Sequence, residues 1–248
     1  MSLSKKKEFR SDSFGLYLLL AAAFIACLVA GNLIFQKFFF VEPFTFLGGK
    51  EDSLLAFIGN YRFELSVGII PYPLTFLITD IISEIYGRKR ANYVVYAGLF
   101  ATLFVWIIVL LAEWAPATDY SPVDDATFIR VFGLTGVALA ASMTAYLIAQ
   151  LIDIRIYHFW KRYTGGRLLW VRNNFSTLSS QFVDTAVVLL LLCTFGAISW
   201  NLFWGLLING FVFKMLIAFL DTPLLYLSTW LIRRKYKLAM AQEMDFIE

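Results

Sequence analysis

Polar side chains recur at helical spacing inside segments that are otherwise apolar. One such stripe consists of Asn174, Thr177, Gln181 and Asp184. Their spacings of three, four and three residues return each side chain to the same face of a helix. The stripe is about 15 Å long at a rise of about 1.5 Å per residue. Because lipid cannot satisfy these groups, we expect the stripe to face other helices or a cavity.

Other apolar segments carry polar groups that could complete such a cavity. In chain order they are Asp80 with Glu84, then Tyr146, Gln150, Asp153 and Tyr157, and finally Lys214 with Asp221. An ionisable group in hydrocarbon costs about 2.5–3.5 kcal/mol on insertion scales, so it faces the bundle interior and usually marks a pathway or a site. Carboxylates accept hydrogen bonds, whereas amides both accept and donate them. The set therefore suits a polar, donor-rich ligand, and a guanine-like edge, an amino acid, a cation and protons all remain open.

Structural roles are the alternative for these residues. Serine and threonine in membrane helices often bond back to their own helix, and asparagine and glutamine often join helices to one another. Lys214 and an aspartate could simply form a neutralising pair. Helix packing alone seldom needs so many carboxylates, so the combined pattern favours a functional cavity.

Composition places these segments in a membrane. The chain has 248 residues, of which 60% are hydrophobic and only 16% are charged, whereas a soluble domain is about one-quarter charged. We expect an all-α integral membrane protein that forms a single polytopic domain over residues 1–248. Cys27 and Cys193 both lie in apolar runs, so neither a disulfide nor a metal site is expected.

Six stretches are long and apolar enough to span a bilayer, which takes about 20 residues. They cover approximately residues 14–39, 65–86, 92–112, 128–152, 173–197 and 203–232. Lysine and arginine gather before the first stretch and after the second, fourth and sixth. Since positive residues stay on the cytoplasmic side, we expect both termini in the cytoplasm.

Several segments of the chain resemble a known family. They are YPLTFLITDIISEIYGRKRA, AYLIAQLIDIRIYHFWKR, WVRNNFSTLSSQFVDT and FKMLIAFLDTPLLYL, together with NLIFQK in the first stretch. All are similar to signature segments of the VUT family of queuosine precursor transporters. They touch five of the six predicted helices, so the resemblance spans nearly the whole chain.

The resemblance implies import of 7-deazaguanine precursors of queuosine across the bacterial inner membrane, for tRNA modification. The substrates would be 7-cyano-7-deazaguanine (preQ0), its aminomethyl relative preQ1, or both. It also implies a six-helix fold similar to the substrate-binding components of energy-coupling-factor importers. The substrate-binding residues under this resemblance are Asp80, Glu84, Gln150, Asp153, Asn173, Asn174, Gln181, Asp184, Lys214 and Asp221. The residues expected to stack on the base are Tyr86 and Tyr157.

Two competing classes of function remain to be weighed. An enzyme is not indicated, because the only histidine, His158, lies at the predicted cytoplasmic edge and no catalytic motif is present. We therefore expect no catalytic residue, no cofactor and no nucleic-acid partner. A substrate-binding subunit of a multi-component vitamin or nucleobase importer is the alternative. Ala22, Ala26 and Ala30 form a small-residue face that could dock an energising partner, although internal packing explains it equally simply. The sequence leaves open the coupling ion and the preferred precursor. It also leaves open the oligomeric state, and a homo-oligomer is one alternative.

Overall fold

The computed structural model describes residues 3–34, 37–42, 63–132, 136–196, 199–239 and 242–244. The helices are α1 (Leu3–Ile34), α3 (Tyr72–Ile85), α4 (Arg88–Glu113), α5 (Asp125–Phe132), α6 (Gly136–Tyr163), α7 (Leu169–Thr194) and α8 (Phe203–Tyr236). The strands are β1 (Phe38–Val41) and β2 (Phe63–Ser66), and the short 3-10 helices are η2 (Val67–Ile69) and η3 (Trp200–Leu202). The prediction of a largely helical protein is confirmed.

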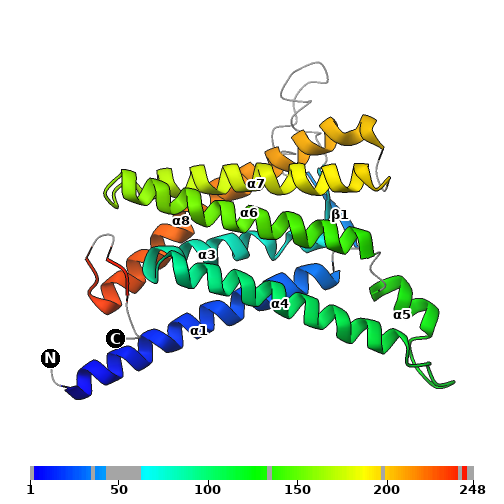
Figure 1. The fold of residues 1–248 in the computed structure, drawn as a ribbon, viewed down its shortest axis with the longest axis horizontal. Helices are drawn as coiled ribbons and strands as arrows, with labels where there is room; N and C mark the ends of the chain where they lie inside the picture. Colours follow the sequence, from blue (N-terminus) through cyan, green and yellow to red (C-terminus); the bar gives the residue numbers. More distant parts are fainter. Residues whose placement is uncertain are drawn as a thin grey trace.

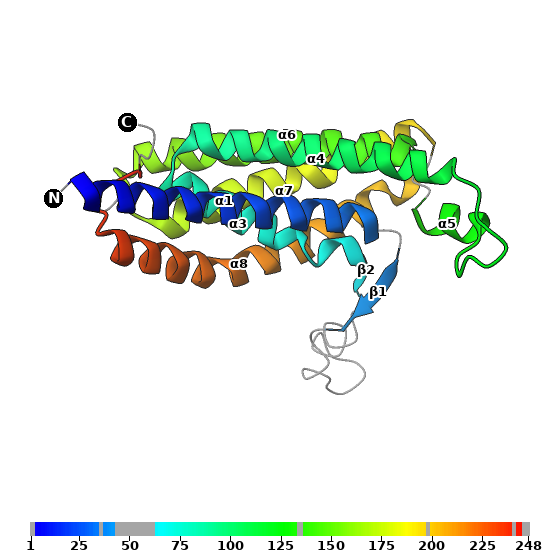
Figure 2. The same cartoon turned by 90° about the horizontal axis from the view of Figure 1, so that it is seen from below.

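The long helices lie side by side as a bundle (Figure 1). The start of α1 and the end of α8 lie at the same end of this bundle, and Figure 2 shows the same arrangement from below. The connections from α3 to α4 and from α6 to α7 are also at that end, while α5 and the β1–β2 pair are at the other. All four basic segments of the sequence therefore belong to one end of the bundle.

Within the described ranges, five helical segments are long and apolar enough to cross a bilayer. They are Ser11–Ile34, Val67–Ile85, Arg88–Glu113, Leu169–Thr194 and Trp200–Tyr236. The helix α6 is not among them although it is 28 residues long and packs along α7. Its polar residues Gln150, Asp153 and Arg155 lower its hydropathy relative to its neighbours.

The structure corrects several predicted boundaries. The first predicted span, 14–39, ends early, because α1 stops at Ile34 and Phe38–Val41 forms a strand. This strand pairs antiparallel with β2, where Phe38 faces Ser66 and Val41 faces Phe63. The chain is therefore not purely α-helical. The expectation missed the pairing because an aromatic run at the end of an apolar segment does not by itself separate helix from strand.

The second and fourth predicted spans also begin later than expected. Instead of starting at residue 65, α3 starts at Tyr72, after β2 and η2. Pro71 occupies its N-cap and Pro73 its second position, where a missing backbone N–H costs no helical hydrogen bond. Instead of one helix over 128–152, the chain forms the separate helices α5 and α6.

The backbone of α4 at Gly98 lies close to side chains of α1. A Cβ atom at Gly98 would lie only 2.6 Å from a ring carbon of Phe24, so only glycine fits there. Phe24 and Leu28 are buried in this contact. The alanine face of α1, formed by Ala22, Ala26 and Ala30, is exposed rather than packed against a described helix.

Candidate substrate-binding site

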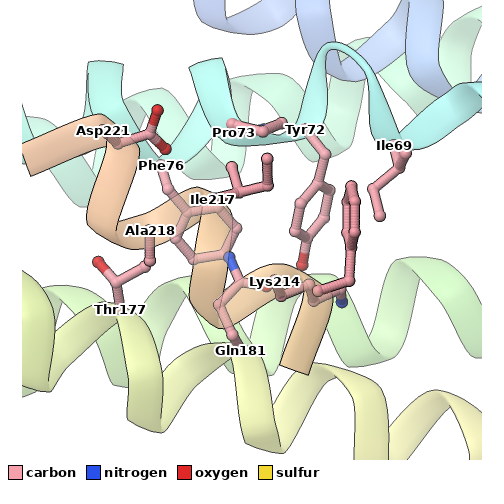
Figure 3. Close-up of a pocket in the computed structure, with 11 residues that line it drawn as sticks. Ile69, Tyr72, Pro73, Phe76, Thr177, Gln181, Lys214, Ile217, Ala218 and Asp221 are labelled. Atoms are coloured by element: carbon pink, nitrogen blue, oxygen red, sulfur yellow. The ribbon is translucent and has the colours of Figure 1, made fainter. Parts of the chain in front are cut away.

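A narrow pocket lies between α3, α7 and α8 (Figure 3). It is lined by Ile69, Tyr72, Pro73, Phe76, Thr177, Gln181, Phe213, Lys214, Ile217, Ala218 and Asp221. It encloses about 280 Å³ including its open mouth, but only a small part of that space is wide enough for a water molecule. Figure 3 shows Asp221 at one end and Ile69 at the other. A flat ring would enter this pocket only if lining side chains moved aside.

A partly buried ion pair lies beside the pocket, with Lys214 in its lining. The Nζ atom of Lys214 lies 2.5 Å from Oδ2 of Asp184, and the Tyr72 hydroxyl donates to the same oxygen at 2.6 Å. Lys214 also lies 4.7 Å from the centre of the Tyr72 ring, within the range of a cation–π contact. Losing one partner of such a pair would leave a buried charge uncompensated. The three side chains therefore fix one another at the pocket wall.

Two other lining residues have acceptor capacity to spare. The Oε1 atom of Gln181 is buried and has no hydrogen-bond partner in the described structure. Asp221 also makes no hydrogen bond or ion pair with any described residue, and its side chain is partly buried. A buried acceptor without a donor costs about 1–3 kcal/mol. A ligand that brings N–H groups into the pocket would remove that cost.

Glu84 is the centre of a second charged cluster, near the end of α3. Its carboxylate lies 2.7 Å from the Arg172 guanidinium and 2.6 Å from that of Arg233, with Lys161 at 3.7 Å. The Tyr157 hydroxyl donates to it at 3.2 Å. Glu84 and Arg172 are each only 2% exposed. Every acceptor position of Glu84 faces a donor from the protein, so this carboxylate has little capacity left for a ligand.

The segment around Glu243 and Met244 contacts the same cluster. Lys161 also pairs with Glu243 at 3.1 Å. The backbone N–H of Met244 donates to the Ile85 carbonyl at 2.6 Å, and Arg90 donates to the Met244 carbonyl at 2.9 Å. The cluster thus joins α3, α6, α7 and α8 to the chain end.

The predicted amides are used mainly to join helices. Asn173 and Asn174 both donate to the Thr222 hydroxyl of α8, at 3.3 and 3.1 Å, and Asn174 also donates to the Trp170 carbonyl at 2.8 Å. Gln150 donates to the Tyr146 hydroxyl at 2.8 Å and accepts from Thr79 at 3.3 Å. These contacts match the structural alternative for interhelical amides.

Two of the predicted acids are buried outside the pocket lining. Asp80 of α3 and Asp153 of α6 are 2% and 0% exposed, and each carboxyl group acts electrostatically on the other. Ser180 donates to Oδ1 of Asp153 at 3.0 Å. Oδ1 of Asp80 and Oδ2 of Asp153 have no partner in the described structure.

Four of the ten predicted binding residues come together at the pocket: Gln181, Asp184, Lys214 and Asp221. The tyrosines predicted to stack are elsewhere. Tyr157 belongs to the Glu84 cluster, and the Tyr86 hydroxyl donates to the Ser13 carbonyl of α1 at 2.8 Å. The aromatic groups that do line the pocket include Tyr72 and Phe76.

Sequence reasoning missed those two aromatics, as well as the buried roles of the basic residues. The sequence IIPYPLTF contains a signal for Tyr72, because an aromatic held between two prolines marks a fixed helix start. Arg172, Lys161 and Arg233 belong to the basic segments from which the sequence predicts only the topology. Their burial depends on how α6, α7 and α8 converge, which no local pattern reports.

The fold and the pocket together define a class of protein. Several helices that are long and apolar enough to cross a membrane surround a narrow, mostly apolar pocket that holds a few polar groups, as in a multi-pass membrane protein. The family described as "putative vitamin uptake transporter" matches residues 66–228. The chain belongs to this family, which confirms the resemblance found in its sequence motifs.

Two curated relatives carry a more specific name. A protein of Bacillus subtilis (strain 168), named "probable queuosine precursor transporter", is 29% identical over 166 residues, which are 65% of this chain and 70% of the relative. A protein of Haemophilus influenzae (strain ATCC 51907 / DSM 11121 / KW20 / Rd) with the same name is 25% identical over 166 residues, 66% of this chain and 63% of the relative. The match thus spans less than two thirds of the second relative's length. No solved structure matches the chain.

Proposed function

We propose that this protein imports queuosine precursors, preQ0 and/or preQ1, across the bacterial inner membrane for tRNA modification. The family supports transport of a small molecule, and the names of both relatives support this class of substrate. The observation that carries the proposal is the pocket between α3, α7 and α8, with acceptor groups from Gln181 and Asp221, one lysine and three aromatic rings.

The chemistry of the base matches these groups. A 7-deazaguanine edge presents N–H and NH2 donors beside a carbonyl acceptor. Gln181 and Asp221 would accept from the donors, and Lys214 would donate to the carbonyl while Asp184 holds it in place. Phe76 and Tyr72 would contact the ring faces, and such stacking contributes about 1–3 kcal/mol per base in nucleic-acid complexes.

The same proposal includes a topology. We place α6 as the sixth span, because it lies within the bundle beside α7 and contributes a buried polar face. Both termini would be cytoplasmic, since the basic segments gather at the end that holds them. The whole chain would form a single membrane domain with a six-helix fold similar to substrate-binding components of energy-coupling-factor importers.

Complementation tests the function directly. The chain would be expressed in a cell that neither makes nor imports the precursor, which is then given a low concentration of preQ0. We expect queuosine to reappear in tRNA, and a Gln181→Met, Asp221→Asn double variant to restore much less of it. Absence of queuosine despite the wild-type protein in the membrane would contradict import by this chain alone. Copurification with an ATPase would then favour the binding-subunit alternative.

A further inference from the structure

The carboxyl groups of Asp80 and Asp153 lie outside the pocket lining. The two side chains come from different helices, α3 and α6, and neither lines the pocket. Both are at least nine-tenths buried, and each has an oxygen without a hydrogen-bond partner in the described structure. Buried acceptors of this kind are expensive unless something occupies them.

The groups around the pair do not supply a counter-charge in contact with it. Arg172 of α7 acts on Asp80 from a distance, but its guanidinium is bound to Glu84 at 2.7 Å. Asp221 of α8 adds further negative charge near Asp80. The titratable groups that face the pair from α3 and α6 are the hydroxyls of Tyr72, Tyr146 and Tyr157. No lysine or arginine forms an ion pair with either acid in the part of the chain that the structure describes.

Two buried neighbouring carboxylates need a positive partner, and a proton fits this site best. Mutual repulsion of two buried carboxylates favours one proton shared by the pair, as in other carboxyl dyads. A hard metal ion would need more oxygen ligands. No group of three or more acidic, histidine or cysteine side chains able to hold a metal ion is found among the described residues.

The position of the pair links it to the pocket. Asp221 lines the pocket and also acts electrostatically on Asp80. Ser180, which donates to Asp153, is the neighbour of Gln181 on α7. A change of charge at the pair therefore acts electrostatically on Asp221, one of the acceptors proposed to hold the base.

We propose that Asp80 and Asp153 bind the proton that drives import, so that the protein is a proton-coupled symporter. This rests on the proposed import of precursors. A proton from the outer water would bind between the two carboxyl groups, with the substrate in the pocket. It would leave to the cytoplasmic water after the substrate, which restores the original charge.

Purified protein in liposomes tests the coupling, with preQ0 as the probe. For one proton per substrate, a gradient of one pH unit supports about tenfold accumulation. We expect this accumulation for the wild type and its loss in the Asp80→Asn, Asp153→Asn double variant. The double variant should still exchange labelled for unlabelled preQ0 without a gradient. Asp124→Asn, an acid-to-amide change outside the membrane, should accumulate preQ0 like the wild type.

Infrared spectroscopy detects protonation of the carboxyl pair without any substrate. The wild type should show the carbonyl stretch of a protonated carboxylic acid at neutral pH, and the double variant should lack it. Accumulation that follows a sodium gradient, or ignores the pH gradient, would overturn the proposal, as would absence of the band. If the wild type fails to exchange preQ0, the proposed substrate is wrong, and the infrared band alone then decides whether the pair holds a proton.

Discussion

Two charged regions lie inside the same bundle and use their charges differently. Around Glu84, three basic side chains and a tyrosine hydroxyl surround one carboxylate. Around Asp184, one lysine and one tyrosine satisfy the acid, while neighbouring Gln181 and Asp221 keep unused acceptors. In this bundle, the proposed binding pocket differs from the Glu84 cluster in that some of its acceptors have no donor in the described structure.

The largest expected effect is a loss of stability on changing Glu84, the centre of the first region. Glu84→Gln would leave Arg172 and Arg233 without their common counter-ion, and breaking a buried pair costs about 3–5 kcal/mol. The melting temperature in detergent, followed by fluorescence, should fall strongly. Glu113→Gln at the end of α4 is the matched control and should melt like the wild type. An unchanged melting temperature of Glu84→Gln would contradict the structural role assigned to Glu84.

A smaller effect, on binding rather than folding, is expected in the pocket. Asp221→Asn replaces a charged acceptor by a neutral amide, and a hydrogen bond to a charged group contributes about 1.5–3 kcal/mol. The affinity for preQ0, measured by scintillation proximity, should fall by about 10–100-fold. The melting temperature should stay the same or rise, because Asp221 has no partner to lose in the described structure. Unchanged affinity would argue against a contact between Asp221 and the base.

Changes at the interhelical amides should lower stability, as at Glu84, but by less. Asn174→Ala removes hydrogen bonds to Thr222 and to the Trp170 carbonyl, each contributing about 0.5–1.5 kcal/mol. We expect a modest drop in melting temperature with preQ0 affinity retained once the protein is folded. Loss of affinity without loss of stability would instead place Asn174 in the binding site.

The smallest effect lies outside the membrane, at the start of α5. The side-chain and backbone hydrogen bonds from Thr127 lower the pKa of Asp124 below its ordinary value. A lowered pKa means that the carboxylate stabilises α5 above the unfolded pKa, and that this contribution is lost as the pH falls through the folded value. The protection factors of the α5 amides, which correct for the pH dependence of intrinsic exchange, should therefore fall at acidic pH in the wild type. Asp124→Ala should show these lower protection factors already at neutral pH.

Local patterns in the sequence predicted the long helices and the helical stripe through Gln181 and Asp184. They did not predict where β1 replaces helix, because the pairing of Phe38–Val41 with Phe63–Ser66 is not a local property. They also could not separate Glu84 from Asp221, since both are acids in apolar segments. The difference arises from which basic side chains reach each acid once α7 and α8 have packed.

Equilibrium binding of preQ0 to the purified protein tests whether the pocket between α3, α7 and α8 holds the base. We expect measurable binding by the wild type and binding weaker by up to about tenfold, for one lost hydrogen bond, by Gln181→Met at unchanged melting temperature. Binding by Gln181→Met as tight as that of the wild type, or no binding by the folded wild type, would contradict the assignment of this pocket to the base.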